Sequence, residues 1–258
     1  MSDLLYEIQD HLCLITLNRE SKLNAFDDQL LIEMQKQFEQ ANNNTQVRVI
    51  ILKANGKHFS AGADLAWMQR MAQFSKAENL KDALILSRLM HTIHHSPKPT
   101  IAMVQGSTFG GGAGLVAACD IGIAADNARF CFSEVRLGLI PAVISPYVVK
   151  AIGERTAKAL FMSAELFDAQ RALAYNLVHH CQPEDQLLNF TLKYAEQISQ
   201  CAPESVRAAK KLTEYVAHKN IDEELGFYTA NLIAQKRVSS EGQKGLQAFL
   251  NKETPNWN

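Results

Sequence analysis

The sequence is short of the features that mark several large classes of protein. Only five of its 258 residues are cysteines, and no two form a C-x-x-C pair, so neither a disulfide framework nor a zinc site is expected. The 26 basic residues nearly balance the 27 acidic ones, which argues against electrostatic binding to nucleic acid or to an anionic membrane. We therefore expect reduced, buried thiols in a cytoplasmic protein with no nucleic-acid partner.

Long apolar runs are also missing. The apolar stretch around 113–125 is interrupted by Asp120, whereas about 20 uninterrupted apolar residues are needed to cross a membrane. The first seven residues already carry Asp3 and Glu7, unlike a signal or transit peptide. We expect no membrane partner and no targeting segment.

Strand and helix patterns alternate over the first 140 residues. Helices are predicted over 27–44, where Asp27 can cap the first turn, and over 76–95. After Pro146 the pattern is almost entirely helical. This organisation indicates an α/β protein whose helices pack on the faces of a sheet. The strand patterns, beginning with a hairpin, occupy residues 4–18, 47–55, 98–106, 119–126 and 128–134.

Three consecutive glycines, Gly110 to Gly112, stand where a predicted strand meets a helix in STFGGGAGLVAACD. Glycine accepts positive φ values, and the first turn of a helix offers unpaired N–H groups to an anion. The chain has no P-loop and no complete G-x-G-x-x-G after its first strand, which argues against a phosphate site and a doubly wound dehydrogenase. This motif alone leaves two interpretations, tight helix packing or stabilisation of an oxyanion.

A second glycine junction follows the same plan. The stretch GKHFSAGADL at 56–65 ends a strand, turns at Gly62 and enters a short predicted helix. Two such junctions could place two backbone N–H groups around one oxygen. A carboxylate, Glu134, follows at a predicted strand end in FSEVRLGLIP.

In this order the motifs resemble the crotonase superfamily of enoyl-CoA hydratases and isomerases. The resemblance extends over nearly the whole chain and is greatest to the methylglutaconyl-CoA hydratase branch. It implies a spiral of ββα units over 1–195 and a C-terminal helical trimerisation region over 196–258, hence a homotrimer or a dimer of trimers. The matching motifs are A-G-A-D at 61–64, G-G-G at 110–112, C-D at 119–120 and S-E-x-x-x-G-x-x-P at 133–141.

The resemblance also implies an acyl-CoA thioester substrate, so coenzyme A is part of the substrate and neither a separate cofactor nor a metal is expected. The N–H groups of Ala63 and Gly111 would hold the thioester oxygen, which gains negative charge as an enolate forms. Preorganised donors at such an oxygen supply a large share of the rate acceleration. Glu134 would transfer the proton.

Gly114 departs from the family pattern, because the usual hydratases carry a second glutamate at the matching position. With Glu134 alone, the chain could hydrate an enoyl-CoA by syn addition, or move a double bond as a Δ3,Δ2-enoyl-CoA isomerase. A third class is an acyl-CoA-binding scaffold without turnover. The resemblance favours a hydratase with a branched, glutaconyl-type substrate, for which Gly114 is expected to leave space. A glutamate placed at 114 would then face Glu134 across a small pocket.

The resemblance assigns further residues to the CoA and the acyl group. Lys22 would approach the phosphates, although the composition of the sequence alone would make it an ordinary exposed lysine. Trp67 would border the acyl pocket, with a core position as the alternative. Arg136 would meet a second substrate carboxylate if the strand continued to it, with a structural salt bridge as the alternative. The other expected contacts, two of them reaching a neighbouring subunit's CoA from the C-terminal segment, are Leu23, Ala25, Ala61, Gly62, Asp64, Leu65, Gly110, Gly114, Phe249 and Lys252.

Overall fold

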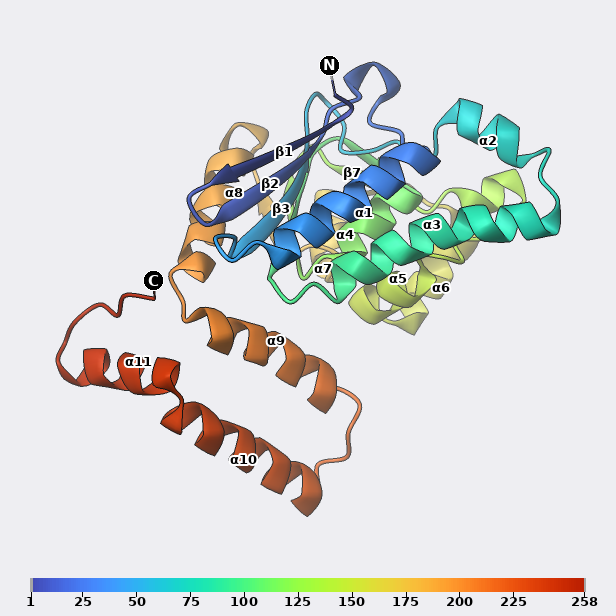
Figure 1. The fold of residues 1–258 in the computed structure, drawn as a ribbon. Coiled ribbons are helices and arrows are strands. Elements are labelled where there is room, and N and C mark those ends of the chain that lie inside the picture. The colour runs from blue at the N-terminus through green and yellow to red at the C-terminus, as the bar shows by residue number, and fades with distance from the viewer. Residues whose placement is uncertain (1, 258) are drawn as a thin grey trace.

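Apolar side chains on both faces of consecutive strands build the main sheet, in a computed structural model that describes residues 2–257 (Figure 1). Its six strands lie in the order β1-β2-β3-β4-β6-β9. β1 (Leu4–Gln9) and β2 (Leu12–Leu17) form an antiparallel hairpin, and every later neighbouring pair is parallel. The other strands are β3 (Val49–Ala54), β4 (Thr100–Val104), β6 (Ile121–Ala125) and β9 (His180–Gln182).

The side chains of the parallel strands alternate between two apolar layers. In β3, Ile50 and Leu52 belong to the larger core, whereas Val49 and Ile51 pack in a second cluster on the opposite face. A parallel strand covered on both faces needs apolar residues at successive positions, as this strand has. The covering helices are α1 (Asp28–Asn43) and α3 (Lys76–His94) on one face and α8 (Glu184–Ser199) on the other.

A second sheet of three short strands leads into the functional region. β5 (Ser107–Phe109) follows β4 and pairs in parallel with β7 (Arg129–Cys131), which follows β6. β8 (Phe167–Asp168) completes the sheet as an antiparallel neighbour of β7. The chain therefore passes from the large sheet to the small one in successive turns of a spiral. α4 (Gly111–Ala118) begins directly after β5.

Shorter helices complete the α/β body around α4, which is buried from Gly112 to its end. They are η1 (Glu20–Lys22), α2 (Leu65–Met71), η2 (Glu134–Leu137), α5 (Ser145–Ile152), α6 (Glu154–Ser163) and α7 (Ala169–Ala174).

The last three helices extend away from this body, coloured orange to red in Figure 1. α9 (Pro203–Val216) and α10 (Glu223–Val238) contain no buried residue, and Ala248 is the buried residue of α11 (Ser240–Leu250). Large apolar side chains on these helices therefore face outward. Those exposed are Tyr215, Phe227, Ile233, Val238, Leu246, Phe249 and Leu250.

Most elements predicted from periodicity are confirmed, including the hairpin at 4–18 and the helices over 27–44 and 76–95. The region after Pro146 is mainly helical as expected, although the short strands β8 and β9 also lie in it. One expectation is wrong. The strand expected over 128–134 ends at Cys131, so Glu134 starts a 3₁₀ helix instead of ending a strand. Strands of two or three residues are too short to show an alternating pattern.

The cysteines are free within residues 2–257. Cys13 and Cys131 are buried as expected, whereas Cys201 is exposed. No helix in this range is long and apolar enough to cross a membrane.

Candidate active site

The first turn of α4 offers a free backbone N–H group. Gly110 precedes the helix with φ 51° and ψ −121°, a conformation that favours glycine. Its own N–H donates to the Cys131 carbonyl over 2.9 Å, which ties it to β7. The N–H of Gly111 has no acceptor among the described residues. A helix N-terminus favours negative charge, so this group is suited to an oxygen that becomes anionic.

A second free N–H group belongs to Ala63, on the loop that precedes α2. The Phe26 N–H donates to the Gly62 carbonyl, and the Phe26 carbonyl accepts from the Asp64 N–H, both over 2.9 Å. Gly62 has φ 93° and passes β5 so closely that a Cβ there would lie 3.0 Å from the Phe109 carbonyl oxygen. Within residues 2–257 the N–H of Ala63, between these bonded neighbours, has no acceptor.

The buried ring of Phe26 joins the two junctions. A Cβ at Gly111 would lie 2.5 Å from Phe26 Cζ, so the ring fills the space beside that glycine. The backbone of the same residue fixes both neighbours of Ala63. Phe26 therefore sets the position of one N–H group relative to the other. It was absent from the predicted site, because a lone aromatic residue in sequence is indistinguishable from any core residue.

Glu134 lies beside the start of α4. A Cβ at Gly110 would lie 3.2 Å from Glu134 Oε1. The other carboxylate oxygen, Oε2, is buried and has no hydrogen-bond partner among the described residues. Burial raises the pKa of the Glu134 carboxyl above its ordinary value of 4.5, because the charged form is desolvated. A partly desolvated carboxyl group of this kind is suited to accept and return a proton.

The expectation of free space at Gly114 is wrong. A Cβ at this position would lie 2.2 Å from Ile144 Cγ2 and 3.1 Å from Met90 Cε. Ile144 is 2% exposed and Met90 is fully buried. The volume over Gly114 therefore belongs to an aliphatic side chain from the start of α5, which no local sequence signal had indicated.

Asp64 lies in a network of charges at the start of α2. Its side chain accepts from the N–H groups of Ala66 and Trp67 and forms an ion pair with Lys22 Nζ over 2.8 Å. The Nη2 atom of the buried Arg19 lies 3.6 Å from Asp64 Oδ2. The hydrogen bond from Lys22 is the main cause that lowers the pKa of Asp64. Lys22 is half-exposed, so its ammonium group combines a fixed position with access to solvent.

The segment that carries Lys22 lies against the loop that carries Ala63. The Ala61 N–H donates to the Leu23 carbonyl over 2.9 Å, and Ala25 is buried. Asn24, which was not predicted, braces this contact by donating to the Asn55 and His58 carbonyls. The structure thus brings the predicted residues of 22–25 and 61–65 together.

The residues predicted to contact the acyl group differ in their surroundings. Trp67 is 4% exposed, and its Nε1–H donates to Asp82 over 2.9 Å, so it occupies the core position given as the alternative. Leu65, in contrast, is 77% exposed at the start of α2.

Arg136 does not lie on a strand, although its expected contact with a substrate carboxylate required the strand to continue to it. The strand ends before this residue, and Arg136 Nη2 donates to the Ala164 carbonyl over 2.6 Å. Ala164 ends α6 in a left-handed conformation with φ 48°. Arg136 therefore braces the end of a helix, through a hydrogen bond instead of the salt bridge considered from sequence.

Phe249 and Lys252 lie outside this cluster. Phe249 lies in α11 and Lys252 follows it, and α11 lies apart from α4 in Figure 1; Phe249 is 80% exposed. Within one chain the structure does not bring them to Glu134.

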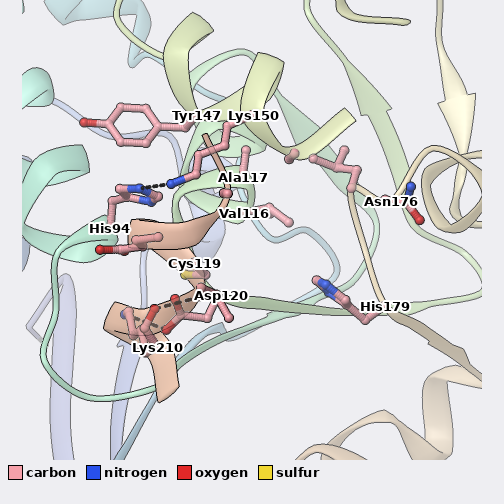
Figure 2. Close-up of a pocket in the computed structure, with 15 residues that line it drawn as sticks. His94, Val116, Ala117, Cys119, Asp120, Tyr147, Lys150, Asn176, His179 and Lys210 are labelled. Atoms are coloured by element: carbon pink, nitrogen blue, oxygen red, sulfur yellow. Dashed lines mark hydrogen bonds and ion pairs between the residues drawn. The ribbon is translucent and has the colours of Figure 1, made fainter. Parts of the chain in front are cut away.

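A cavity of about 380 Å³ lies at the opposite end of α4, beside Val116, Ala117 and Cys119 (Figure 2). Two pairs of polar side chains are in contact in its lining. Lys210 of α9 forms an ion pair with Asp120 over 2.7 Å, and Lys150 Nζ lies 3.1 Å from His94 Nε2. The ion pair between Lys210 and Asp120 connects α9 to the body. The cavity is separate from the Glu134 region, because neither free N–H group lines it.

Three comparisons relate this geometry to known proteins. The family model for enoyl-CoA hydratase/isomerase matches residues 7–258. A Legionella pneumophila crystal structure, named after the enoyl-CoA hydratase/isomerase (crotonase) class, superimposes with a TM-score of 0.98 at 70% identity over 100% of both chains. The 2,3-dehydroadipyl-CoA hydratase of Escherichia coli is 31% identical over 100% of this chain and 99% of its own length. The trans-2-decenoyl-[acyl-carrier-protein] isomerase of Streptococcus mutans is 28% identical over 98% of this chain and 97% of its own length.

Proposed function

Because the chain belongs to the enoyl-CoA hydratase/isomerase family, we propose that it is a hydratase that adds water to an α,β-unsaturated acyl-CoA thioester, or removes it. One observation carries this proposal. The buried, unpartnered Oε2 of Glu134 lies beside the helix start whose Gly111 N–H is also free. Their proximity supports the proposal of a proton acceptor beside an oxygen-binding group.

The N–H groups of Ala63 and Gly111 are proposed to bind the thioester oxygen. As water adds to the β-carbon, the electrons of the double bond move toward this oxygen and form an enolate. Each fixed donor in such a hole contributes roughly 3–4 kcal/mol to transition-state stabilisation. Phe26 supports the assignment, since its ring packs against Gly111 and its backbone hydrogen-bonds both neighbours of Ala63.

Glu134 is proposed to act as base and then as acid. It takes a proton from water while the water oxygen bonds to the β-carbon, and it delivers that proton to the α-carbon of the enolate. A single carboxyl group can do both when water and proton add to the same face. Its raised pKa supports this role, because the carboxylate is then a stronger base than an exposed one. The reaction adds water across a double bond and needs no external oxidant or reductant, so we expect no cofactor beyond the CoA of the substrate.

Lys22 and the backbone of Leu23 and Ala61 are proposed to bind the CoA nucleotide. In a trimer, Phe249 and Lys252 of one subunit would reach the CoA of the next. The outward-facing apolar side chains of the C-terminal helices support such an assembly, because patches of this kind mark interaction surfaces. A branched glutaconyl group remains our candidate for the acyl part. Its second carboxylate must then be met by a group other than Arg136, which is bonded to Ala164.

An isomerase is the second candidate, and the lone carboxylate favours it. Glu134 could remove a proton from one carbon and return it two carbons away, with no water bound. The Streptococcus mutans relative is named an isomerase of an unsaturated acyl chain.

Turnover in D₂O distinguishes these functions. The purified protein is supplied with crotonyl-CoA, 3-methylglutaconyl-CoA and a 3-enoyl-CoA, and the products are analysed by mass spectrometry. We expect a 3-hydroxyacyl-CoA with solvent deuterium at the α-carbon. A shifted double bond that retains substrate hydrogen would establish the isomerase instead. Binding of the thioesters without any turnover would indicate a scaffold.

A further inference from the structure

We propose that Ile144 is a specificity-determining residue of this site. Its side chain takes the volume over Gly114, limits the site to one carboxylate and gives the acyl group an apolar, branched wall beside Glu134. This inference rests on the proposed function, and it names the kind of acyl substituent that the site accepts.

The contact between Ile144 and Gly114 leaves no room for another side chain. A Cβ at residue 114 would lie 2.2 Å from Ile144 Cγ2 and 2.7 Å from Ile144 Cβ. Real Cβ atoms are not found this close to a neighbouring carbon. Met90 of α3 closes the same volume from another element. Glycine at 114 is therefore a packing requirement for as long as Ile144 is present.

Glu134 and Ile144 lie over consecutive turns of α4. Glu134 Oε1 is close to Gly110, and Ile144 is close to Gly114. These two glycines are joined by a hydrogen bond from the Gly114 N–H to the Gly110 carbonyl, over 3.1 Å. Four residues of helix rise about 6 Å, which is roughly the length of four or five carbon–carbon bonds of an acyl chain. A substrate whose reacting carbons lie at Glu134 would therefore meet Ile144 with a substituent a few bonds further along.

The backbone around Ile144 is held firmly. Its carbonyl accepts from the N–H groups of Tyr147 and Val148, both over 3.1 Å, and Pro146 lies in the first turn of α5. The side chain is also enclosed, because Ile144 is 2% exposed. The wall beside Glu134 is thus a fixed feature and not a mobile loop.

The chemistry of this wall selects the substrate. A hydroxyl or carboxylate pressed against Ile144 and Met90 would lose water without gaining a hydrogen bond, which is unfavourable. A hydrogen or a small alkyl branch loses nothing there. We infer that the substituent facing this wall is a compact hydrocarbon group; in a branched glutaconyl thioester this would be the alkyl branch, with the carboxylate turned away from Ile144 and Met90.

The first test truncates the wall. Ile144→Ala is compared with Ile152→Ala, which removes the same atoms from a buried position later in α5. We expect Ile144→Ala to raise kcat/KM for 2-hexenoyl-CoA relative to crotonyl-CoA by at least about 10-fold, since a difference of a few methylene groups in a pocket reaches that size. Ile152→Ala should leave the ratio unchanged. An unchanged ratio in Ile144→Ala would overturn the inference. If that variant does not fold, Ile144→Val is used, with a smaller shift in the same direction.

The second test measures packing without activity, so it separates this inference from the proposed function. Gly114→Ala should lower the melting temperature strongly in the native background and only slightly in the Ile144→Ala background. Equal losses in both backgrounds would contradict the contact. In the same way, Gly114→Glu should fail to fold or lose activity, and Gly114→Glu/Ile144→Ala should fold and bind acetyl-CoA. If packing is coupled but no enoyl-CoA is turned over, the proposed function fails and the contact stands.

Discussion

The ring of Phe26 lies against the α-carbon of Gly111, where a Cβ would meet Phe26 Cζ at 2.5 Å. The contact links two glycine loops that are about 50 residues apart in the sequence, because the backbone of Phe26 also holds both neighbours of Ala63. An aromatic residue and a glycine thus define the distance between the two proposed oxygen-binding N–H groups.

Adding a methyl group at Gly111 should therefore disable the site while the body of the fold persists. We expect Gly111→Ala to lower kcat by about 100-fold or more, because the clash with Phe26 displaces the N–H group, and an oxyanion hole without one effective donor is slowed by about that much. Gly226→Ala in α10 is the matched control, because nothing lies within 4 Å of a Cβ there. Circular dichroism checks that both variants fold. Native turnover in Gly111→Ala would mean that the glycines serve packing alone.

Glu134→Gln should remove the proton-transfer group and keep the shape of the site. We expect kcat to fall by at least about 100-fold, the lower range for general acid–base catalysis, with acetyl-CoA binding nearly unchanged. Glu154→Gln, at an exposed residue paired with Lys158, is the control and should retain activity. A Glu134→Gln variant with near-native turnover would exclude Glu134 as the base.

The raised pKa of Glu134 also predicts how stability changes with pH. Between the ordinary value of 4.5 and the raised value, the folded chain binds a proton that the unfolded chain has released. The free energy of unfolding contributed by this group therefore falls as the pH rises through that interval. Glu134→Gln lacks this titration, so its melting temperature relative to the parent protein should increase across the interval and then stay level. A relative melting temperature that decreases with pH would show that the pKa is lowered instead.

Arg136→Met tests whether Arg136 recognises substrate or only supports the helix end. Loss of its hydrogen bond to the Ala164 carbonyl should lower the free energy of unfolding by about 0.5–1.5 kcal/mol, because Arg136 is exposed and the carbonyl keeps its hydrogen bond from Cys131 Sγ. Activity on crotonyl-CoA and on 3-methylglutaconyl-CoA should then fall to a similar extent. A loss confined to 3-methylglutaconyl-CoA would restore the role in substrate recognition, and Arg136→Lys should recover part of the stability in either case.

Features that depend on local backbone chemistry could be predicted from the sequence. Gly62 and Gly110 adopt positive φ values at their junctions, and α4 starts at Gly111 as the strand-to-helix pattern requires. The long helices could also be predicted from the sequence. In α1, for example, Leu30, Met34 and Phe38 recur at helical spacing and are all buried.

Features that depend on distant packing could not be predicted. Nothing in the local sequence indicates that Ile144 covers Gly114, since the two residues belong to different helices. The end of β7 before Glu134 was missed because apolar residues continue beyond the last paired one. The proposed roles of Phe249 and Lys252 require a second chain, so neither the sequence nor one chain's fold can position them.

The contact between Ile144 and Gly114 also restricts the evolutionary routes open to this site. A lineage that gained a glutamate at 114 while it retained Ile144 would have to displace Ile144, because a Cβ at 114 would lie 2.2 Å from Ile144 Cγ2, and it would lose stability or activity before a second acid could be of use. Shortening of residue 144 must come first, and the carboxylate second. The two positions are therefore epistatic, and one-acid and two-acid forms of this site are separated by an ordered pair of substitutions in which the intermediate carries a small residue at 144.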